Sequence, residues 1–225
     1  NIFPRLPPSK ARLDLLMELA GTGIAEAFFI LHHLHESVQL VGDVCEFGVA
    51  QGFTSALLAS ELSNSDKHLW LFDSFAGLPK PSAKDHLIDD IFHLGSIEQY
   101  EGTMSYAASM VERRVAAVGL SGERTHIVSG FIEELPAETA FPQRVCFAYV
   151  DFDFYEPIRT ALLRLHPLLS PGGVIIVDDY GFFSSGAKTA VDEFVEDHAG
   201  LYSASSPSEA MGFFRILVKN SVAVS

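Results

Sequence analysis

Apolar and polar positions alternate along this chain in a way that predicts buried strands separated by helices. Residues 145–150 and 174–177 are almost entirely apolar, which is typical of parallel strands that helices cover on both faces. Between them, Pro157 stands where it can open a helix, and Pro171–Gly173 predicts a turn that starts the second strand. The stretch 145–181 is therefore predicted to be a strand–helix–strand crossover.

The same alternation extends over the rest of the chain. Further strands are predicted at 44–47, 68–73, 124–129, 201–205 and 213–218, and further helices at 53–62, 104–118 and 186–198. A proline-rich arm (1–9) precedes a helical cap that continues to Val41, with a break at 21–23. Residues 76–103 are irregular, and a segment of this length is usually a lid or a binding loop, which we expect at about 76–106. The pattern predicts an α/β fold with a seven-stranded, mostly parallel sheet and helices on both faces. In this prediction 1–41 form the arm and cap, 42–220 the main domain and 221–225 a tail.

Two pairs of acids follow the two central strands: Asp151 and Asp153 after the first, Asp178 and Asp179 after the second. A right-handed crossover places both strand ends at one edge of the sheet, where open α/β sheets bind ligands. One such pair alone is more often loop solvation or a helix cap. Two pairs at one edge repel each other unless raised pKa values or a divalent cation offset the repulsion. All-oxygen ligands favour Mg²⁺, Mn²⁺ or Ca²⁺ over zinc, so we expect a site for one of these ions.

A glycine turn between the first predicted strand and its helix is a second candidate site. Residues 46–52 read ExGxxxG, and glycines there let the backbone of a strand–helix turn approach a ligand closely. The GxGxxG pattern of dinucleotide binders is absent, as is the GKS or GKT of phosphate loops. A small zwitterion such as the methionine part of S-adenosylmethionine fits better than a diphosphate, although packing alone explains many such glycines. Asp73, at the end of the next strand, is placed to bind ribose hydroxyls.

Composition narrows the class of partner. The chain has 225 residues, 48% of them hydrophobic, and a formal net charge of −14, which suits one large core and disfavours nucleic acid as a partner. No apolar run has membrane-spanning length, and the start at Asn1 shows no signal-peptide pattern. Cys45 and Cys146 lie in strand-like runs without metal-binding spacing, so we expect reduced core cysteines in a cytoplasmic protein.

Three histidines lie close together in the predicted cap, at His32, His33 and His35. One interpretation is that this group binds a metal. The favoured interpretation is that the histidines are exposed or pack within the cap, because we expect no carboxylate or cysteine at helical spacing to complete a ligand set.

Five sequence blocks, in order, resemble one family. They are GDVCEFGVAQG, LFDSFAGLP, VSGFIEELP, AYVDFDFYEP and PGGVIIVDDYG. Together they are similar to the macrocin O-methyltransferase (TylF-like) family, over roughly Gly42 to Lys219. The resemblance implies the Rossmann-like class I methyltransferase fold. It also implies methylation of a sugar or related hydroxyl on an antibiotic-type metabolite, with S-adenosylmethionine and Mg²⁺. The implied partner is a small glycosylated acceptor, and a homodimer is expected.

The resemblance also assigns roles to residues. The metal ligands fall on Asp151, Asp178 and Asp179, and the general base falls on Asp153. The implied cofactor contacts are Glu46, Gly48, Val49, Ala50, Gln51, Gly52, Thr54, Asp73, Ser74, Phe75, Gly130, Phe131 and Asp151.

Three other functions compete with this one. A metal-dependent methyltransferase of catechols or other phenols would use the same acids, and the predicted lid leaves it open because it carries Phe92, Tyr100, Met104 and Tyr106. A non-catalytic S-adenosylmethionine-binding module is disfavoured because all four acids are present. A dinucleotide oxidoreductase is disfavoured by the missing GxGxxG.

Overall fold

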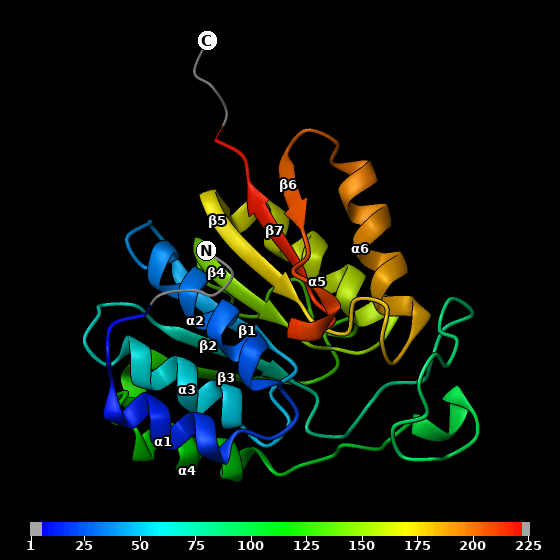
Figure 1. Cartoon of the computed structure of the whole chain (residues 1–225), viewed down its shortest axis with the longest axis horizontal. Helices are drawn as coiled ribbons and strands as arrows, with labels where there is room; N and C mark the ends of the chain where they lie inside the picture. Colours follow the sequence, from blue (N-terminus) through cyan, green and yellow to red (C-terminus); the bar gives the residue numbers. More distant parts are fainter. Residues whose placement is uncertain (1–5, 222–225) are drawn as a thin grey trace.

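A single mixed sheet forms the centre of the computed structural model, which describes residues 6–221. The predictions for residues 1–5 of the arm and 222–225 of the tail lie outside the described residues. The strands are β1 (Asp43–Phe47), β2 (Leu69–Asp73), β3 (Thr125–Ser129), β4 (Val145–Val150), β5 (Leu169–Val177), β6 (Tyr202–Ser205) and β7 (Arg215–Lys219). Their order is β3-β2-β1-β4-β5-β7-β6 (Figure 1), with β7 antiparallel to both neighbours and every other pair parallel. The predicted seven-stranded, mostly parallel sheet is confirmed.

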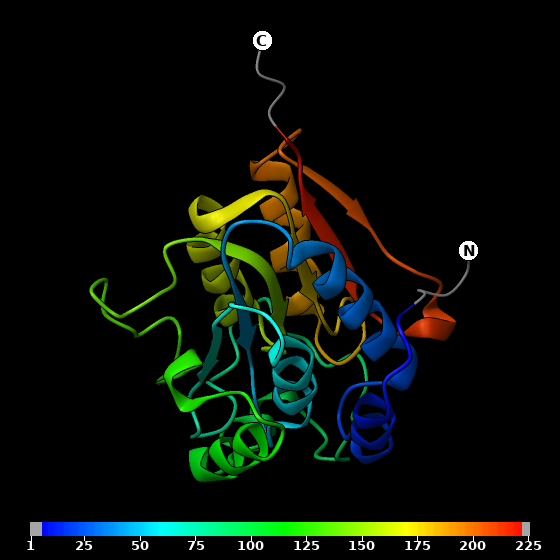
Figure 2. The same cartoon turned by 90° about the vertical axis from the view of Figure 1, so that its left-hand side faces the viewer.

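Helices cover both faces of this sheet (Figures 1 and 2). The α-helices are α1 (Lys10–Glu18), α2 (Ile24–Ser37), α3 (Phe53–Leu62), α4 (Ala108–Ala117), α5 (Tyr155–Leu168) and α6 (Ser185–Asp197), and short 3₁₀ turns are η1 (Ile97–Tyr100), η2 (Gly122–Arg124) and η3 (Glu209–Met211). Successive side chains of a strand point to opposite faces. Phe147 and Tyr149 of β4 therefore pack with α1–α4, and Ala148 and Val150 pack with α5 and α6. This two-sided burial explains the near-continuous apolar run of β4.

Several predicted boundaries differ from the structure, and two of the differences have a clear backbone cause. Strand β5 begins at Leu169, before the Pro171–Gly173 turn, and its register with β4 shifts there. The turn is accommodated as an irregularity within the strand, with Gly172 at a φ of 78°. Helix α4 begins at Ala108, not at Met104, because Met104 has a φ of 59° and left-handed backbone cannot continue a right-handed helix.

The irregular segment 76–106 is anchored to the main domain. The buried Asp85 carboxylate accepts hydrogen bonds from the Tyr155 backbone N–H (2.9 Å) and the Ser184 hydroxyl (3.1 Å). Tyr100 is fully buried and packs against Phe183. These contacts fix the segment on the starts of α5 and α6, next to the carboxyl ends of the strands. Whether it acts as a lid stays a prediction.

Two further expectations concern burial and membranes. Cys45 and Cys146 are both free and buried in the sheet, as predicted. In the part of the chain that the structure describes, no helix is both long and apolar enough to cross a bilayer.

Candidate active site at the carboxyl ends of the strands

A cavity of about 430 Å³ opens at the carboxyl ends of β1, β2, β4 and β5. It is lined by the glycine turn after β1, by all four predicted aspartates and by parts of segment 76–106. Of the residues predicted to contact a cofactor, Gly52 and Phe75 are the two outside its lining. The prediction that both acid pairs and the glycine turn meet at one sheet edge therefore agrees with the structure.

The glycine turn is shaped by close approach of two backbones. Gly48 has a φ of 84°, and a Cβ atom there would overlap the backbone oxygen of Asp151. Ala50 also has left-handed backbone, with a φ of 46°, a conformation that side chains adopt at some cost. Glycine at position 48 is thus required by the packing of β1 against β4, and the same packing brings the turn beside the acids.

Asp73 braces this turn. Its Oδ2 atom accepts hydrogen bonds from the backbone N–H groups of Val49 (2.7 Å) and Ala50 (2.9 Å), and its Oδ1 accepts one from Phe75 (2.7 Å). A carboxylate has about four acceptor positions, so one remains for a ribose hydroxyl. The predicted ribose contact stays a prediction.

Glu46 is buried under the turn. Burial raises the pKa of its carboxyl group to about 8, against the opposing effect of the Ser55 hydroxyl, which donates a hydrogen bond at 2.5 Å. Without a cationic partner, this side chain is therefore largely protonated at neutral pH.

The four aspartates form one acid centre, defined as Asp151, Asp153, Asp178 and Asp179, in which Asp178 is buried and the other three are half-buried. Burial raises the pKa of each one, and charges on neighbouring carboxylates add to the effect for Asp151, Asp153 and Asp179. Asp151, Asp153 and Asp179 each offer an oxygen within 4.8 Å of the others. Asp153 and Asp179 have φ values of 62° and 55°. Left-handed backbone at two half-buried acids is the kind of strain that clusters at functional sites.

Asp178 differs from the other three because two short hydrogen bonds hold its carboxylate. The Tyr149 hydroxyl donates to its Oδ2 at 2.6 Å, and the Asp179 backbone N–H donates to its Oδ1 at 2.7 Å. The three acids whose oxygens lie close together are Asp151, Asp153 and Asp179. The ligand set assigned by the resemblance differs at one position, because it contains Asp178 and gives Asp153 the role of general base.

Two residues beside the acid centre, Glu26 and Tyr149, were missed by the sequence analysis. Glu26 of α2 is buried beside Asp178, and its pKa is raised by burial and then by the Asp178 charge. Its carboxylate lies 3.5 Å from the Tyr149 hydroxyl. Glu26 could have been found from the sequence, because it is the one acid in the apolar stretch 24–31. Tyr149 could not, because a tyrosine in an apolar strand is common in protein cores.

The wall opposite the acid centre is apolar and aromatic. It includes Ile91, Phe92, Met104 and Tyr106 from the irregular segment, together with Phe182.

Three other tyrosines near the site, Tyr100, Tyr155 and Tyr180, lie outside the cavity lining. Tyr100 donates its hydroxyl to Asp90 at 2.6 Å and does not line the cavity. Tyr155 and Tyr180 donate to Glu193 and Asp192 of α6, each away from the cavity lining.

Known proteins resemble this chain in sequence and in fold. The 8-demethyl-8-(2,3-dimethoxy-alpha-L-rhamnosyl)-tetracenomycin-C 4'-O-methyltransferase of Streptomyces olivaceus is 31% identical to this chain. The match covers 74% of this chain and 61% of that protein. The mycinamicin III 3''-O-methyltransferase of Micromonospora griseorubida is 30% identical over 70% of this chain and 61% of its own. This chain thus spans about three fifths of the length of these relatives.

Solved structures give the same fold. The O-methyltransferase NovP superposes with a TM-score of 0.74 at 22% identity, covering 90% of this chain and 84% of NovP. The calicheamicin methyltransferase CalS11 superposes with a TM-score of 0.66 at 16% identity, covering 96% of this chain and 95% of CalS11. The family described as macrocin-O-methyltransferase (TylF) matches residues 30–203. With most of its length inside that match, this chain belongs to the macrocin-O-methyltransferase (TylF) family.

Proposed function

We propose that this chain transfers a methyl group from S-adenosylmethionine to a sugar hydroxyl of a glycosylated natural product, with the help of Mg²⁺. The observation that carries the proposal is that the glycine turn and the acid centre of four carboxylates line one cavity. Family membership supports methyl transfer, and the sugar-directed names of the relatives support a sugar hydroxyl as the acceptor.

In this proposal the cofactor occupies the side of the cavity formed by β1 and β2. The Glu46 carboxylate would hold the ammonium group of the methionine part, since a cation offsets the burial that otherwise raises its pKa. Asp73 would bind the ribose, and Gly130 with Phe131 would flank the adenine. Placement of the sulfonium near the acid centre follows from the contact between Gly48 and Asp151.

The acid centre fits a hard divalent cation. Its donors are carboxylate oxygens, and burial and mutual repulsion disfavour their charged forms unless a cation compensates. Asp151 and Asp179 belong both to the close group of three and to the set assigned by resemblance. When bound, Mg²⁺ lowers the pKa of a coordinated hydroxyl and orients it.

Asp153 is the proposed general base. The acceptor oxygen forms a bond to the methyl carbon, the carbon–sulfur bond breaks, and S-adenosylhomocysteine leaves. The hydroxyl proton passes to the Asp153 carboxylate. Asp178 is held by Tyr149 and contacts Glu26. These two neighbours act as positioning residues for the acid centre.

The aromatic wall is the proposed place for the rest of the acceptor. Phe92 and Ile91 line the cavity and remain 48% and 36% exposed, and Ile88 and Leu94 continue this apolar surface outside it. An apolar aglycone would cover this surface while the sugar reaches the acids. A phenolic acceptor is the second candidate, because Phe92 and Tyr106 offer aromatic contact.

Two calorimetric titrations test the proposal: S-adenosylmethionine into the protein, then MgCl₂ into its complex with S-adenosylhomocysteine. We expect one cofactor per chain and a Mg²⁺ signal that Asp178→Asn weakens by about 10–100-fold. Phe131→Ala should weaken only the cofactor. Cofactor binding without any response to Mg²⁺ would contradict the metal-dependent mechanism, and absent cofactor binding would contradict methyl transfer.

We also propose a homodimer formed through the N-terminal helices. Leu13 and Met17 of α1 are 60% and 83% exposed, and Val41 is 74% exposed. Exposed apolar side chains are typical of interfaces between subunits when they form a contiguous patch, and Leu13 and Met17 lie four residues apart on one helix. Sedimentation equilibrium at micromolar concentration should give twice the chain mass, and a monomer there would rule the dimer out.

The free, buried cysteines support the proposal that the chain works in the cytoplasm.

A further inference from the structure

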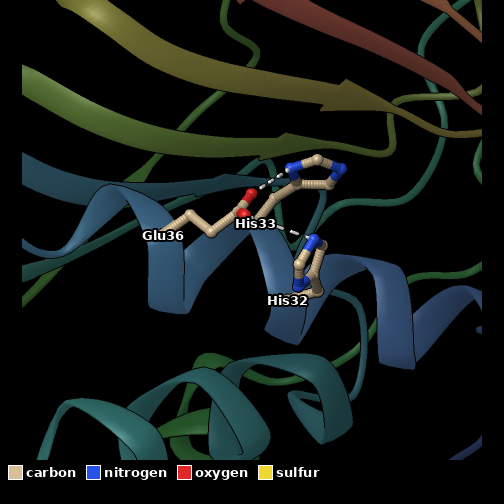
Figure 3. A group of neighbouring side chains, drawn as sticks. All are labelled: His32, His33 and Glu36. Carbon is tan, nitrogen blue, oxygen red and sulfur yellow. Dashed lines mark ion pairs between the residues drawn. The ribbon is translucent and has the colours of Figure 1, made fainter. Parts of the chain in front are cut away.

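A second group of metal-ligand side chains lies on α2, outside the cavity. His32, His33 and Glu36 point toward one another near the end of this helix (Figure 3). His32 Nε2 and His33 Nδ1 each lie 3.4 Å from an oxygen of Glu36. The expectation that no carboxylate completes the histidine group was therefore wrong, because Glu36 follows His32 by four residues and His33 by three, and both spacings bring helical side chains together.

The spacing of the three side chains suits a small cation. Each residue offers one ligand atom, and these atoms lie within 4.8 Å of one another. Two ligands bound to zinc at about 2.05 Å and at the tetrahedral angle are about 3.3 Å apart. The two nitrogen–oxygen distances are thus already close to the bound value. The two distances involve different Glu36 oxygens, Oε1 for His32 and Oε2 for His33, so both carboxylate oxygens face the histidines, and rotation of the partly exposed rings would bring the nitrogens onto one ion.

Charge in this group also suits a metal. The pKa of His33 is lowered by burial and then by the neighbouring His32, against the opposing effect of Glu36. The nearby His35 is different, because its Nε2 contacts Glu61 at 2.7 Å and that carboxylate also pairs with Arg12. His35 is therefore occupied, whereas the His32–His33–Glu36 group has no other cation facing its carboxylate among the ion pairs of the described residues.

We propose that His32, His33 and Glu36 form a binding site for a borderline divalent cation of the zinc class, separate from the acid centre. Imidazole nitrogens favour Zn²⁺, Ni²⁺ and Cu²⁺, whereas carboxylates alone favour Mg²⁺ and Ca²⁺. The two sites would thus select different ions. The first turn of α2 carries Glu26 into the acid centre, and this group lies roughly 9–15 Å farther along the same helix axis. A cation here would tie together the last turns of the helix that presents Glu26.

Titration with ZnCl₂ in excess MgCl₂ tests the proposal, since Mg²⁺ then occupies the oxygen site. Calorimetry should show one zinc per chain, and Co²⁺ should give visible absorption bands of a four-coordinate ion. Glu36→Gln and His33→Gln should each weaken zinc by at least about tenfold. Two matched control variants should keep the wild-type affinity for zinc. They are His35→Gln, on the same helix but outside the group, and Asp151→Asn in the acid centre.

Folding of each variant is checked by thermal melting followed by circular dichroism. If His33→Gln does not fold, the more exposed His32→Gln replaces it. Unchanged zinc affinity in Glu36→Gln and in either histidine variant would overturn the proposal. So would zinc binding that is lost only in Asp151→Asn, because that result would place the ion in the acid centre.

Discussion

The two sides of the cavity are built in different ways. The side formed by β1 and β2 depends on backbone: a glycine turn fixed against Asp151, with its N–H groups held by Asp73. The rest of the lining is made of side chains from distant segments, with Asp178 and Asp179 after β5 and Phe92 from the irregular segment. This difference indicates that the proposed cofactor side tolerates little change, whereas the proposed acceptor side can vary without disturbing the sheet.

The largest effect is expected for Asp153→Asn. Loss of a general base should lower kcat by about 10²–10⁴-fold, and calorimetry should show S-adenosylmethionine affinity within about twofold of the wild type. Normal turnover would remove Asp153 from its role. Weakened cofactor binding of similar size would show that the two sides of the cavity are not separable.

Glu46→Gln should change how stability depends on pH. The pKa of Glu46 is raised to about 8 in the folded chain, so its contribution to stability is fully present below its unfolded pKa, about 4.3, and is lost as pH rises through 8. The variant should therefore lose less stability than the wild type between pH 5 and 8.5, by on the order of 4 kcal/mol at most. Urea unfolding without cofactor measures this difference, and parallel curves for the two proteins would contradict the raised pKa.

Gly48→Ala tests the backbone side directly. The new Cβ atom would overlap the Asp151 oxygen at a φ of 84°, so we expect a loss of about 3 kcal/mol in the free energy of unfolding. Gly95→Ala is the matched control, because Gly95 also has a positive φ but no atom within 4 Å of the new Cβ. Equal losses in the two variants would assign the effect to φ alone.

The smallest effect is expected for Phe92→Ala on the acceptor side. Removing an exposed aromatic contact should raise KM for an aglycone-bearing acceptor by about three- to tenfold, equivalent to roughly 1 kcal/mol, with kcat and cofactor affinity unchanged. Leu201→Ala, at an exposed apolar residue outside the cavity, should leave KM unchanged. A fall in kcat without a change in KM would contradict a binding role.

The parts of the site that the sequence predicted are those set by the chain's local pattern. Apolar runs located the strands, and strand ends brought Asp151 and Asp178 to one edge because parallel strands end together. Glu26 and Tyr149 were missed because their proximity depends on how α2 packs on β4. The start of α4 was misplaced because the left-handed backbone at Met104 has no signature in a non-glycine residue.

The anchoring of segment 76–106 has a practical consequence for engineering. Its apolar rim, 88–94, lies between two fixed points, the buried Asp85 and the buried Tyr100. Neither anchor lines the cavity, and the rim contributes no strand to the sheet. We therefore expect that the rim can be exchanged between relatives, with Asp85 and Tyr100 kept, so that the proposed acceptor preference changes while the proposed methyl-donor side stays intact.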